Sequence, residues 1–162
     1  NDYGCLGQNQ APAQLGYVSS PVQIPGTTWS DTCSSCYSFY TMAALKTDGT
    51  MWTWGYNNYG VLGQSKEAAQ LTALSSPTQI PGTTWNNLLG QSKSCIYATK
   101  TDGSLWAVGS NTYGQLGQNE QGNPGARSSP VQIGSGTDWS NLLPNKSGSG
   151  RSKTFMIKRI PV

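Results

Sequence analysis

The side chains that could carry out chemistry in this sequence are few. Its 162 residues include no histidine, seven acids and four cysteines. Without histidine there is no Ser-His-Asp or Cys-His arrangement, no His-bound zinc and no usual general base at neutral pH. An enzyme built from this chain would have to work with carboxylates or thiols alone.

Two of the acids recur in the same context and could be read as a general acid and a general base. Asp48 and Asp102 each stand in Lys-Thr-Asp-Gly, between two strand-like runs. Because Asp-Gly between strands favours a hairpin turn of type I′, we expect the two acids in turns of separate repeats. We therefore predict no catalytic residues and no enzymatic activity.

The cysteines offer one short motif, in which Cys33 and Cys36 are separated by two serines. A zinc site would need two more ligands, and Cys5 and Cys95 stand far away in the sequence. A redox pair would need a helix N-terminus to lower the thiol pKa, whereas this motif falls in an expected loop between strands. We expect a local disulfide or two free thiols, and we predict no metal and no cofactor.

Composition limits the fold class and the partners. Charged residues make up 10% of the chain, aromatic residues another 10%, and there are 20 glycines and 9 prolines. This mixture argues against both a disordered chain and a long helical bundle. No run of about 18 apolar residues occurs, so we predict no membrane insertion. Residues 146–162 hold five of the ten basic residues, but in no base-reading pattern, so we expect no nucleic-acid site.

The chain is organised as a tandem repeat. Asn-x-Tyr-Gly, Leu-Gly-Gln, Ser-Ser-Pro-x-Gln-Ile and a closing tryptophan follow one another three times, which divides the chain into units 1–56, 57–110 and 111–162. Each unit predicts short strands, with a final strand missing from the third unit. These strands are Pro21–Ile24 with its counterparts, the segments around Trp29, Trp85 and Trp139, then Thr41–Leu45, Cys95–Thr99 and Thr154–Ile157, and finally Met51–Trp54 and Leu105–Val108. Four short antiparallel strands in about 50 residues are typical of a β-propeller blade.

The repeated tyrosines, glycines and tryptophans are expected to have structural roles. The glycines suit positive φ or close backbone approach in the link between blades, and the tryptophans suit the core between blades. The residues concerned are Tyr3, Gly4, Gly7, Trp29, Tyr59, Gly60, Gly63, Trp85, Tyr113, Gly114, Gly117 and Trp139. We also expect Leu6, Leu62 and Leu116 to pack between blades.

Two segments, Met51–Gln64 and Leu105–Gln118, resemble the repeat of the regulator of chromosome condensation (RCC1) family. The resemblance covers nearly the whole chain. It implies an all-β fold, an RCC1-like β-propeller with three tandem four-stranded blade repeats, the last of them incomplete. Members of the family use the propeller as a protein-binding scaffold, in nucleotide exchange on a small GTPase with chromatin binding, in β-lactamase inhibition, or in surface and virion proteins. The polar repeats look more like the bacterial and tailed-phage members.

The segments that differ between units are the candidate binding loops. They comprise Asn9–Val18, Ser65–Leu74 and Asn119–Arg127 after Leu-Gly-Gln, and Ser30–Tyr40, Asn86–Ser94 and Ser140–Lys153 after the repeated tryptophan. The candidate binding residues are Tyr17, Lys66, Glu67, Glu120 and Arg127. Drift of unconstrained loops would produce the same variation, so both interpretations stay open.

These features predict a non-catalytic protein-interaction or structural module, set in a phage virion or in an exported bacterial protein. The alternatives are an RCC1-type chromatin-binding guanine-nucleotide exchange regulator, and a glycan-binding tail or surface protein. Three units are too few to close a propeller ring, so we expect the chain to be part of a larger ring. Further blades of the same protein, a second copy of the chain or a different protein partner would then cover the exposed blade faces.

Overall fold

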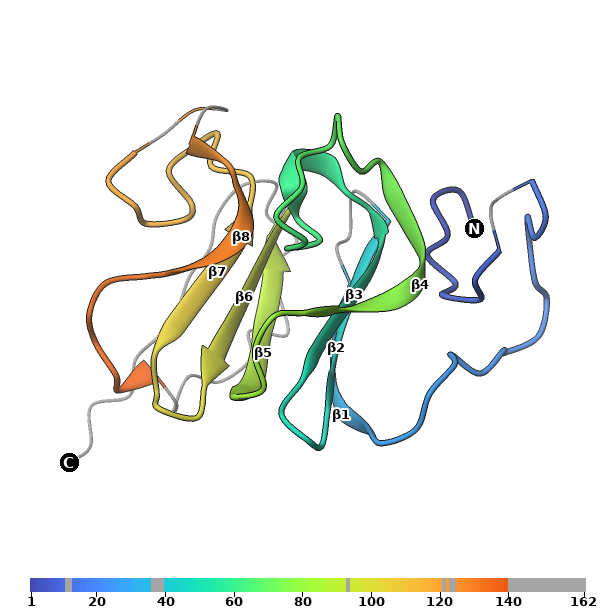
Figure 1. Cartoon of the computed structure of the whole chain (residues 1–162), viewed down its shortest axis with the longest axis horizontal. Coiled ribbons are helices and arrows are strands. Elements are labelled where there is room, and N and C mark those ends of the chain that lie inside the picture. The colour runs from blue at the N-terminus through green and yellow to red at the C-terminus, as the bar shows by residue number, and fades with distance from the viewer. Residues whose placement is uncertain (11–12, 36–39, 93, 121, 123–124, 140–162) are drawn as a thin grey trace.

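The computed structural model describes residues 1–10, 13–35, 40–92, 94–120, 122 and 125–139. Within these ranges the chain forms two four-stranded antiparallel sheets side by side, with one short 3-10 helix, η1 (Asn58–Gly60) (Figure 1). The first sheet contains β1 (Trp29–Ser35), β2 (Thr41–Lys46), β3 (Met51–Tyr56) and β4 (Ala73–Ile80). The second contains β5 (Trp85–Ser92), β6 (Cys95–Lys100), β7 (Leu105–Gly109) and β8 (Arg127–Gln132). The all-β prediction is confirmed, and no helix in the described ranges is long and apolar enough to span a bilayer.

The sheets are offset from the repeat units of the sequence. The Ser-Ser-Pro strand was expected to open each blade, but it closes the blade of the preceding unit. Strand β4 pairs with β3, with Thr53 opposite Thr78, and β8 pairs with β7, with Ala107 opposite Val131. Each sheet therefore takes three strands from one unit and the fourth from the next, while the unit limits at 56/57 and 110/111 remain predictions.

The same offset explains the one expected strand that does not form. Residues 21–24 are not a strand, although their counterparts in β4 and β8 are. A fourth strand needs the third strand of the preceding unit as its partner. The described residues contain no such strand for residues 21–24 to pair with. The expected strands within β1 to β3 and β5 to β7 are confirmed. Trp139 is not in a strand, and Thr154–Ile157 lies outside the described residues.

Two of the segments expected to be loops are mostly strand. Strand β1 continues to Ser35 and β5 continues to Ser92, so Ser30–Tyr40 and Asn86–Ser94 contain only short connections. Register shifts interrupt both strands, one between Trp29 and Cys33 and two within β5. Such bulges break the period-2 alternation by which a strand is recognised in sequence.

The Asp-Gly hairpins are not the expected type I′ turns. Leu45 pairs with Met51, and the N–H of Lys46 donates to Thr50 O at 2.9 Å, which leaves a three-residue loop at 47–49. Only Gly49 has a positive φ in this loop, at 79°, and the matching Gly103 has φ 80°. The extra threonine before Asp-Gly lengthens the loop, so a single glycine at its end supplies the left-handed residue.

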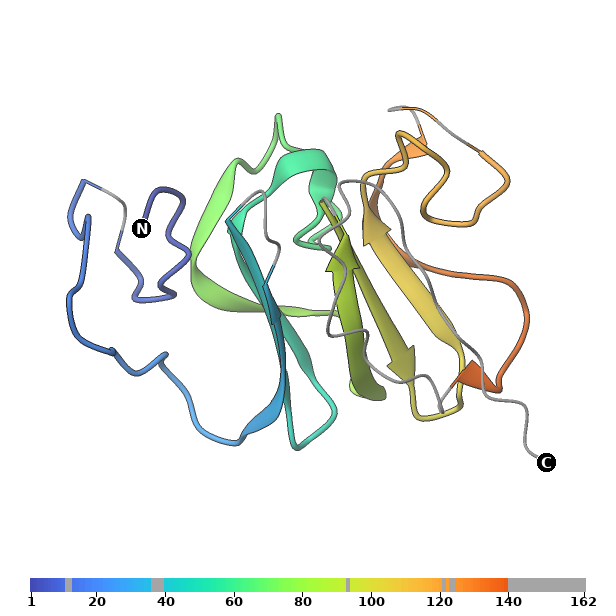
Figure 2. The same ribbon diagram turned by 180° about the vertical axis from the view of Figure 1, so that it is seen from behind.

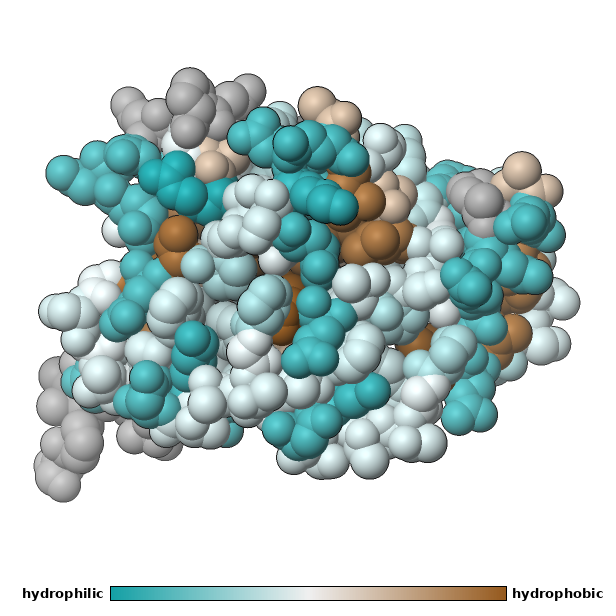
Figure 3. Space-filling view, viewed as in Figure 1, coloured by the Kyte–Doolittle hydropathy of each residue, from teal (hydrophilic) through white to brown (hydrophobic). Residues whose placement is uncertain are grey.

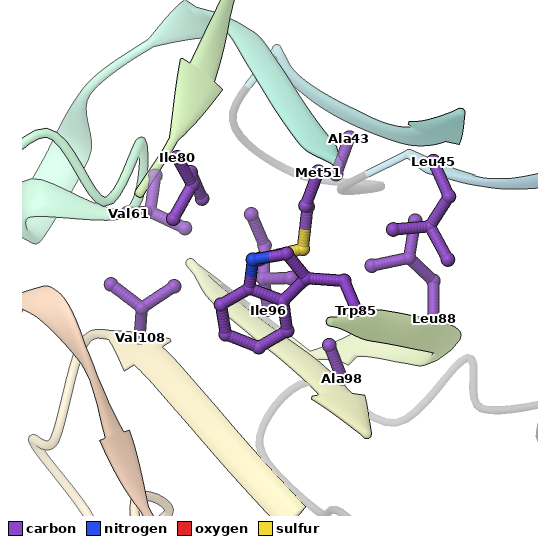
Figure 4. Packing of buried hydrophobic residues seen from close by; sticks show 10 residues of the cluster. All are labelled: Ala43, Leu45, Met51, Val61, Ile80, Trp85, Leu88, Ile96, Ala98 and Val108. Atoms are coloured by element: carbon purple, nitrogen blue, oxygen red, sulfur yellow. The ribbon is translucent and has the colours of Figure 1, made fainter. Parts of the chain in front are cut away.

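The core lies between the two sheets. Ten buried apolar residues, nine from the two sheets and Val61 from the link after η1, form one cluster (Figure 4): Ala43, Leu45, Met51, Val61, Ile80, Trp85, Leu88, Ile96, Ala98 and Val108. Trp85 is 3% exposed and lies at the centre of this cluster. The opposite face of the second sheet carries a second buried cluster that includes Cys95, Tyr97 and Leu116. Alternation along β6 therefore buries both faces of that sheet, as expected for a blade between two neighbours.

A lysine packs between two tryptophan rings in each sheet. Lys46 Nζ lies 4.9 Å from the ring centroid of Trp29 and 4.2 Å from that of Trp52. In the second sheet, Lys100 Nζ lies 4.9 Å from Trp85 and 3.8 Å from the Trp106 ring centroid. These distances are within cation–π range. The repeated lysine of Lys-Thr-Asp-Gly therefore joins the first strand of each sheet to the third.

We expect Trp85→Ala to lower the free energy of unfolding by about 3–5 kcal/mol, because it empties the centre of the inter-sheet core. Val22→Ala is the control, since Val22 is 41% exposed, and it should change the free energy by less than about 0.5 kcal/mol. Guanidinium denaturation followed by circular dichroism measures both. Equal effects of the two substitutions would show that the sheets do not share this core.

Candidate functional site

The antiparallel order places two kinds of connection at opposite edges of the sheets (Figures 1 and 2). The loop edge consists of the described residues of connections 36–40, 57–72, 93–94 and 110–126. The hairpin edge consists of connections 47–50, 81–84 and 101–104. The repeated Lys-Thr-Asp-Gly and Pro-Gly-Thr-Thr sequences lie at the hairpin edge. Two of the dissimilar segments after Leu-Gly-Gln, Ser65–Leu74 and Asn119–Arg127, lie at the loop edge, whereas Asn9–Val18 precedes the first described strand.

A repeated asparagine, buried in the second and third units and half-buried in the first, holds each variable loop to the scaffold. Asn57 is fully buried, and its Oδ1 accepts a hydrogen bond from Leu62 N at 3.0 Å. Its Nδ2 donates to Lys66 O at 3.0 Å and to Leu71 O at 2.8 Å. Asn1 and Asn111 make equivalent contacts in the other two units. The asparagine of Asn-x-Tyr-Gly is present in all three units, but the motif alone did not indicate that it anchors a loop.

The links after Asn57 and Asn1 dock closely on the fourth strand of a sheet. Gly60 has φ 72°, and a Cβ at this position would lie 2.6 Å from the Cβ of Ser128 in β8. Only glycine permits both the backbone conformation and this approach. Ser65 N then donates to Ser128 O at 2.8 Å. The first unit repeats the arrangement between Gly4 and Ser75.

The five candidate binding residues occupy separate places. Tyr17 is 93% exposed in the first loop. Lys66 and Glu67 are exposed next to each other in the second. In the third, Arg127 Nη2 lies 2.7 Å from Glu120 Oε2 and forms an ion pair. The structure therefore joins Glu120 to Arg127 but does not gather all five residues into one site.

A hollow of about 350 Å³ opens where the second link meets the second and third loops. Residues of all three segments line it: Asn58, Tyr59, Glu67, Ala68, Ala69, Ala126 and Ser128. Glu67 is the one lining residue among the sequence candidates. The lining alanines, Ala68, Ala69 and Ala126, are not repeated between units, so the sequence did not indicate them as site residues.

Three tyrosines of the first blade stack at the loop edge. Tyr3 lies 4.2 Å from Tyr56 and 5.5 Å from Tyr40 between ring centroids. Tyr3 is 36% exposed and Tyr40 is 50% exposed. The second blade has Ser94 and Ser110 at the places of Tyr40 and Tyr56, since both pairs share the same backbone hydrogen bond. The scaffold therefore does not require these aromatic rings.

The two repeated acids serve their own hairpins. Thr50 donates to Asp48 Oδ1 from its N–H at 3.0 Å and from its Oγ1 at 2.6 Å, and Trp52 Nε1 donates to Thr50 Oγ1 at 2.8 Å. The hydrogen bond from the Thr50 hydroxyl, with that from its N–H, lowers the pKa of Asp48 below its usual value. Asp102 has the same bonds from Ser104, which lower its pKa in the same way.

No group of three acids or cysteines in the described part of the chain is placed to hold a metal ion. Cys5 is half-buried and Cys95 is buried, and neither forms a disulfide. The Cys95 thiol donates to Ser110 O at 2.9 Å. Cys33 lies in β1, where it pairs with Ala44. Cys36 and the basic residues of 146–162 lie outside the described residues.

The family follows from the repeats and the two sheets they form. The sequence model of the Regulator of chromosome condensation (RCC1) repeat family matches residues 48–88 and 102–158. The chain belongs to the RCC1 repeat family. Its two sheets are blades of an RCC1-type β-propeller.

Solved RCC1-type structures support the fold. The chain is similar to human WBSCR16, with a TM-score of 0.63 and 20% identity over 83% of this chain and 33% of that one. It is also similar to Prp20p from Saccharomyces cerevisiae, with a TM-score of 0.50 and 14% identity over 58% of this chain and 23% of that one. This RCC1-repeat chain thus spans between about a quarter and a third of the length of these structures. A search of curated protein sequences gave no match.

We expect Asn57→Ala to release the second loop, because two loop carbonyls and the Leu62 amide lose a buried partner. The free energy of unfolding should fall by about 1–3 kcal/mol, and the Leu62 amide should exchange its hydrogen faster. Asn58→Ala is the matched control, since Asn58 is the half-buried neighbour. Hydrogen exchange followed by NMR measures both variants. An unchanged Leu62 exchange rate in Asn57→Ala would contradict the anchoring role.

Proposed function

We propose that the chain is a non-catalytic protein-interaction module that binds its partner through the loop edge. One observation carries this proposal: at that edge a constant asparagine holds loops of different sequence, whereas the opposite edge repeats its sequence. Variation on one side of a repeat scaffold is typical of a binding face. The exposed tyrosines of this edge are of the residue type enriched at protein interfaces.

The chemistry of the scaffold also supports a non-catalytic role. The sequence has no histidine, and the two repeated acids accept hydrogen bonds inside their own hairpins. A protein partner is consistent with the similar yeast protein Prp20p, which binds Gsp1p and histones.

The uncharged polar composition of the repeats supports a virion or an exported surface protein as the setting of this module. The alternative is a chromatin-binding exchange regulator, which would present a basic surface to nucleic acid. The charged candidates of the described loop edge are balanced, with Lys66 beside Glu67 and Arg127 paired with Glu120. In the space-filling view, hydrophilic residues are widely scattered over the displayed face, with hydrophobic residues showing in small separate areas (Figure 3).

A photo-crosslinking amino acid at Lys66 or Glu120 should capture one and the same protein in the native host. The control positions are Thr47 and Thr101, which are exposed at the hairpin edge and should capture nothing above background. Mass spectrometry identifies the adduct, and the purified partner must then bind the full chain. Capture from the hairpin edge, or from neither edge, would refute the proposal.

A second candidate function is glycan binding at the Tyr3–Tyr40–Tyr56 cluster. Exposed stacked aromatic rings offer apolar faces with a hydroxyl at the rim, which suits the amphipathic surface of a sugar ring. Serines stand at the equivalent places of the second blade, so the fold does not need the aromatic rings of Tyr40 and Tyr56.

The glycan candidate predicts that Tyr40→Ser and Tyr56→Ser abolish binding on a glycan array while leaving the melting temperature nearly unchanged. Tyr113→Ser is the control, since Tyr113 is 67% exposed and is not one of the three stacked rings. Glycan binding that survives both cluster substitutions would exclude this site, and absence of any glycan signal for the unmodified protein would exclude the function.

A further inference from the structure

We propose that the hollow at Tyr59 and Glu67 is a socket for a lysine or arginine side chain of the partner protein, which rests on the proposed function of the loop edge. The hollow is bounded by the second link, by the turn at 67–69 and by the start of β8. Its volume of about 350 Å³ is at the small end of the range for ligand pockets. A single long side chain is therefore a better match than a large ligand.

The charge of the lining favours a cation. Among the described residues, Glu67 is the one charged residue that lines the hollow. Arg127 stands next to two lining residues, but its guanidinium is paired with Glu120 at 2.7 Å and donates to the carbonyls of Gly125 and Ala126. Lys66 precedes Glu67 in the chain but does not line the hollow. A bound cation would thus meet one carboxylate with no positive group among the lining residues.

The backbone of Tyr59 is an exception among the three links. Tyr59 has φ 56° and ψ 26°, whereas Tyr3 and Tyr113, at the same place in the repeat, have no positive φ. A bulky residue in this conformation costs free energy and is found where surrounding contacts require it, often at binding sites. Tyr59 also lines the hollow, and an aromatic ring attracts a cation through its π face.

The remaining lining suits the aliphatic part of a basic side chain. Ala68, Ala69 and Ala126 contribute small apolar surfaces. Lysine and arginine bury their methylene stems on such surfaces while the charged head reaches a polar group. Asn58 and Ser128 add neutral hydrogen-bonding groups to the wall. The combination of one carboxylate, one aromatic ring and three methyl groups complements a long cation better than an anion or a purely apolar group.

NMR titration of the isotope-labelled chain tests the socket with two matched peptides. The first is Gly-Ser-Lys-Ser-Gly, and the second replaces the lysine by norleucine, which keeps most of the aliphatic stem and removes the charge. The lysine peptide should shift the amides of Tyr59, Ala68, Ala69 and Ser128, and the norleucine peptide should not. Methyl glucoside serves as the third probe.

Glu67→Gln should weaken binding of the lysine peptide by about threefold or more, since one ion pair and its hydrogen bond are lost. Asp2→Asn is the control for net charge, because Asp2 is an exposed acid of the first link, and it should leave the affinity unchanged. Equal shifts from both peptides, no shift from either, or shifts from the glucoside alone would overturn the socket. A partner that still crosslinks at Lys66 after such a result would leave the loop-edge function standing, so the two failures are distinguishable.

Discussion

Every blade of this chain depends on a strand supplied by the next repeat. Strand β4 closes the first sheet and β8 closes the second, although both strands belong to the following unit of the sequence. The chain must therefore cross the loop edge after β3 or β7 before it returns as a fourth strand. The link that makes this crossing after β3 docks on the fourth strand of the next sheet, with Gly60 against Ser128 of β8, and Gly4 of the first unit lies in the same way against Ser75 of β4. The link of one unit is thus coupled to a strand supplied by the following unit, and the glycine permits their close approach.

The sequence predicted those parts of the fold that depend on local pattern. The strands that begin at Trp29 and Trp85 and the apolar strands after them are confirmed, because each is determined by residues next to one another in the chain. The offset between units and sheets was not predictable in that way. A Ser-Ser-Pro strand can pair with a strand of its own unit or with one of the preceding unit, and only long-range packing decides between them. The turn at 47–49 was mispredicted for a local reason, since Thr47 adds a residue to the loop.

The candidate site was less predictable than the fold. The variable segments Ser65–Leu74 and Asn119–Arg127 do lie at one edge, which the order of antiparallel strands requires. Their individual residues gave a weaker signal: Glu120 meets Arg127 in an ion pair, whereas Tyr17 stands apart with 93% of its side chain exposed. The stacked tyrosines and the conformation of Tyr59 were missed. Contacts between residues far apart in the chain produce both features, and no short sequence motif indicates such contacts.

The way the loops are held explains why their sequences can differ at all. Asn57 donates its two side-chain hydrogen bonds to the carbonyl oxygens of Lys66 and Leu71. Asn111 donates in the same way to the carbonyl oxygen of Glu120. A carbonyl oxygen is present at every residue, so the anchor imposes no side chain on the loop that it holds. At the hairpin edge the contacts run instead through side chains, such as Asp48 with Thr50, and there the sequence repeats. The choice between backbone and side-chain acceptors thus separates an edge free to acquire new binding chemistry from one that must be preserved.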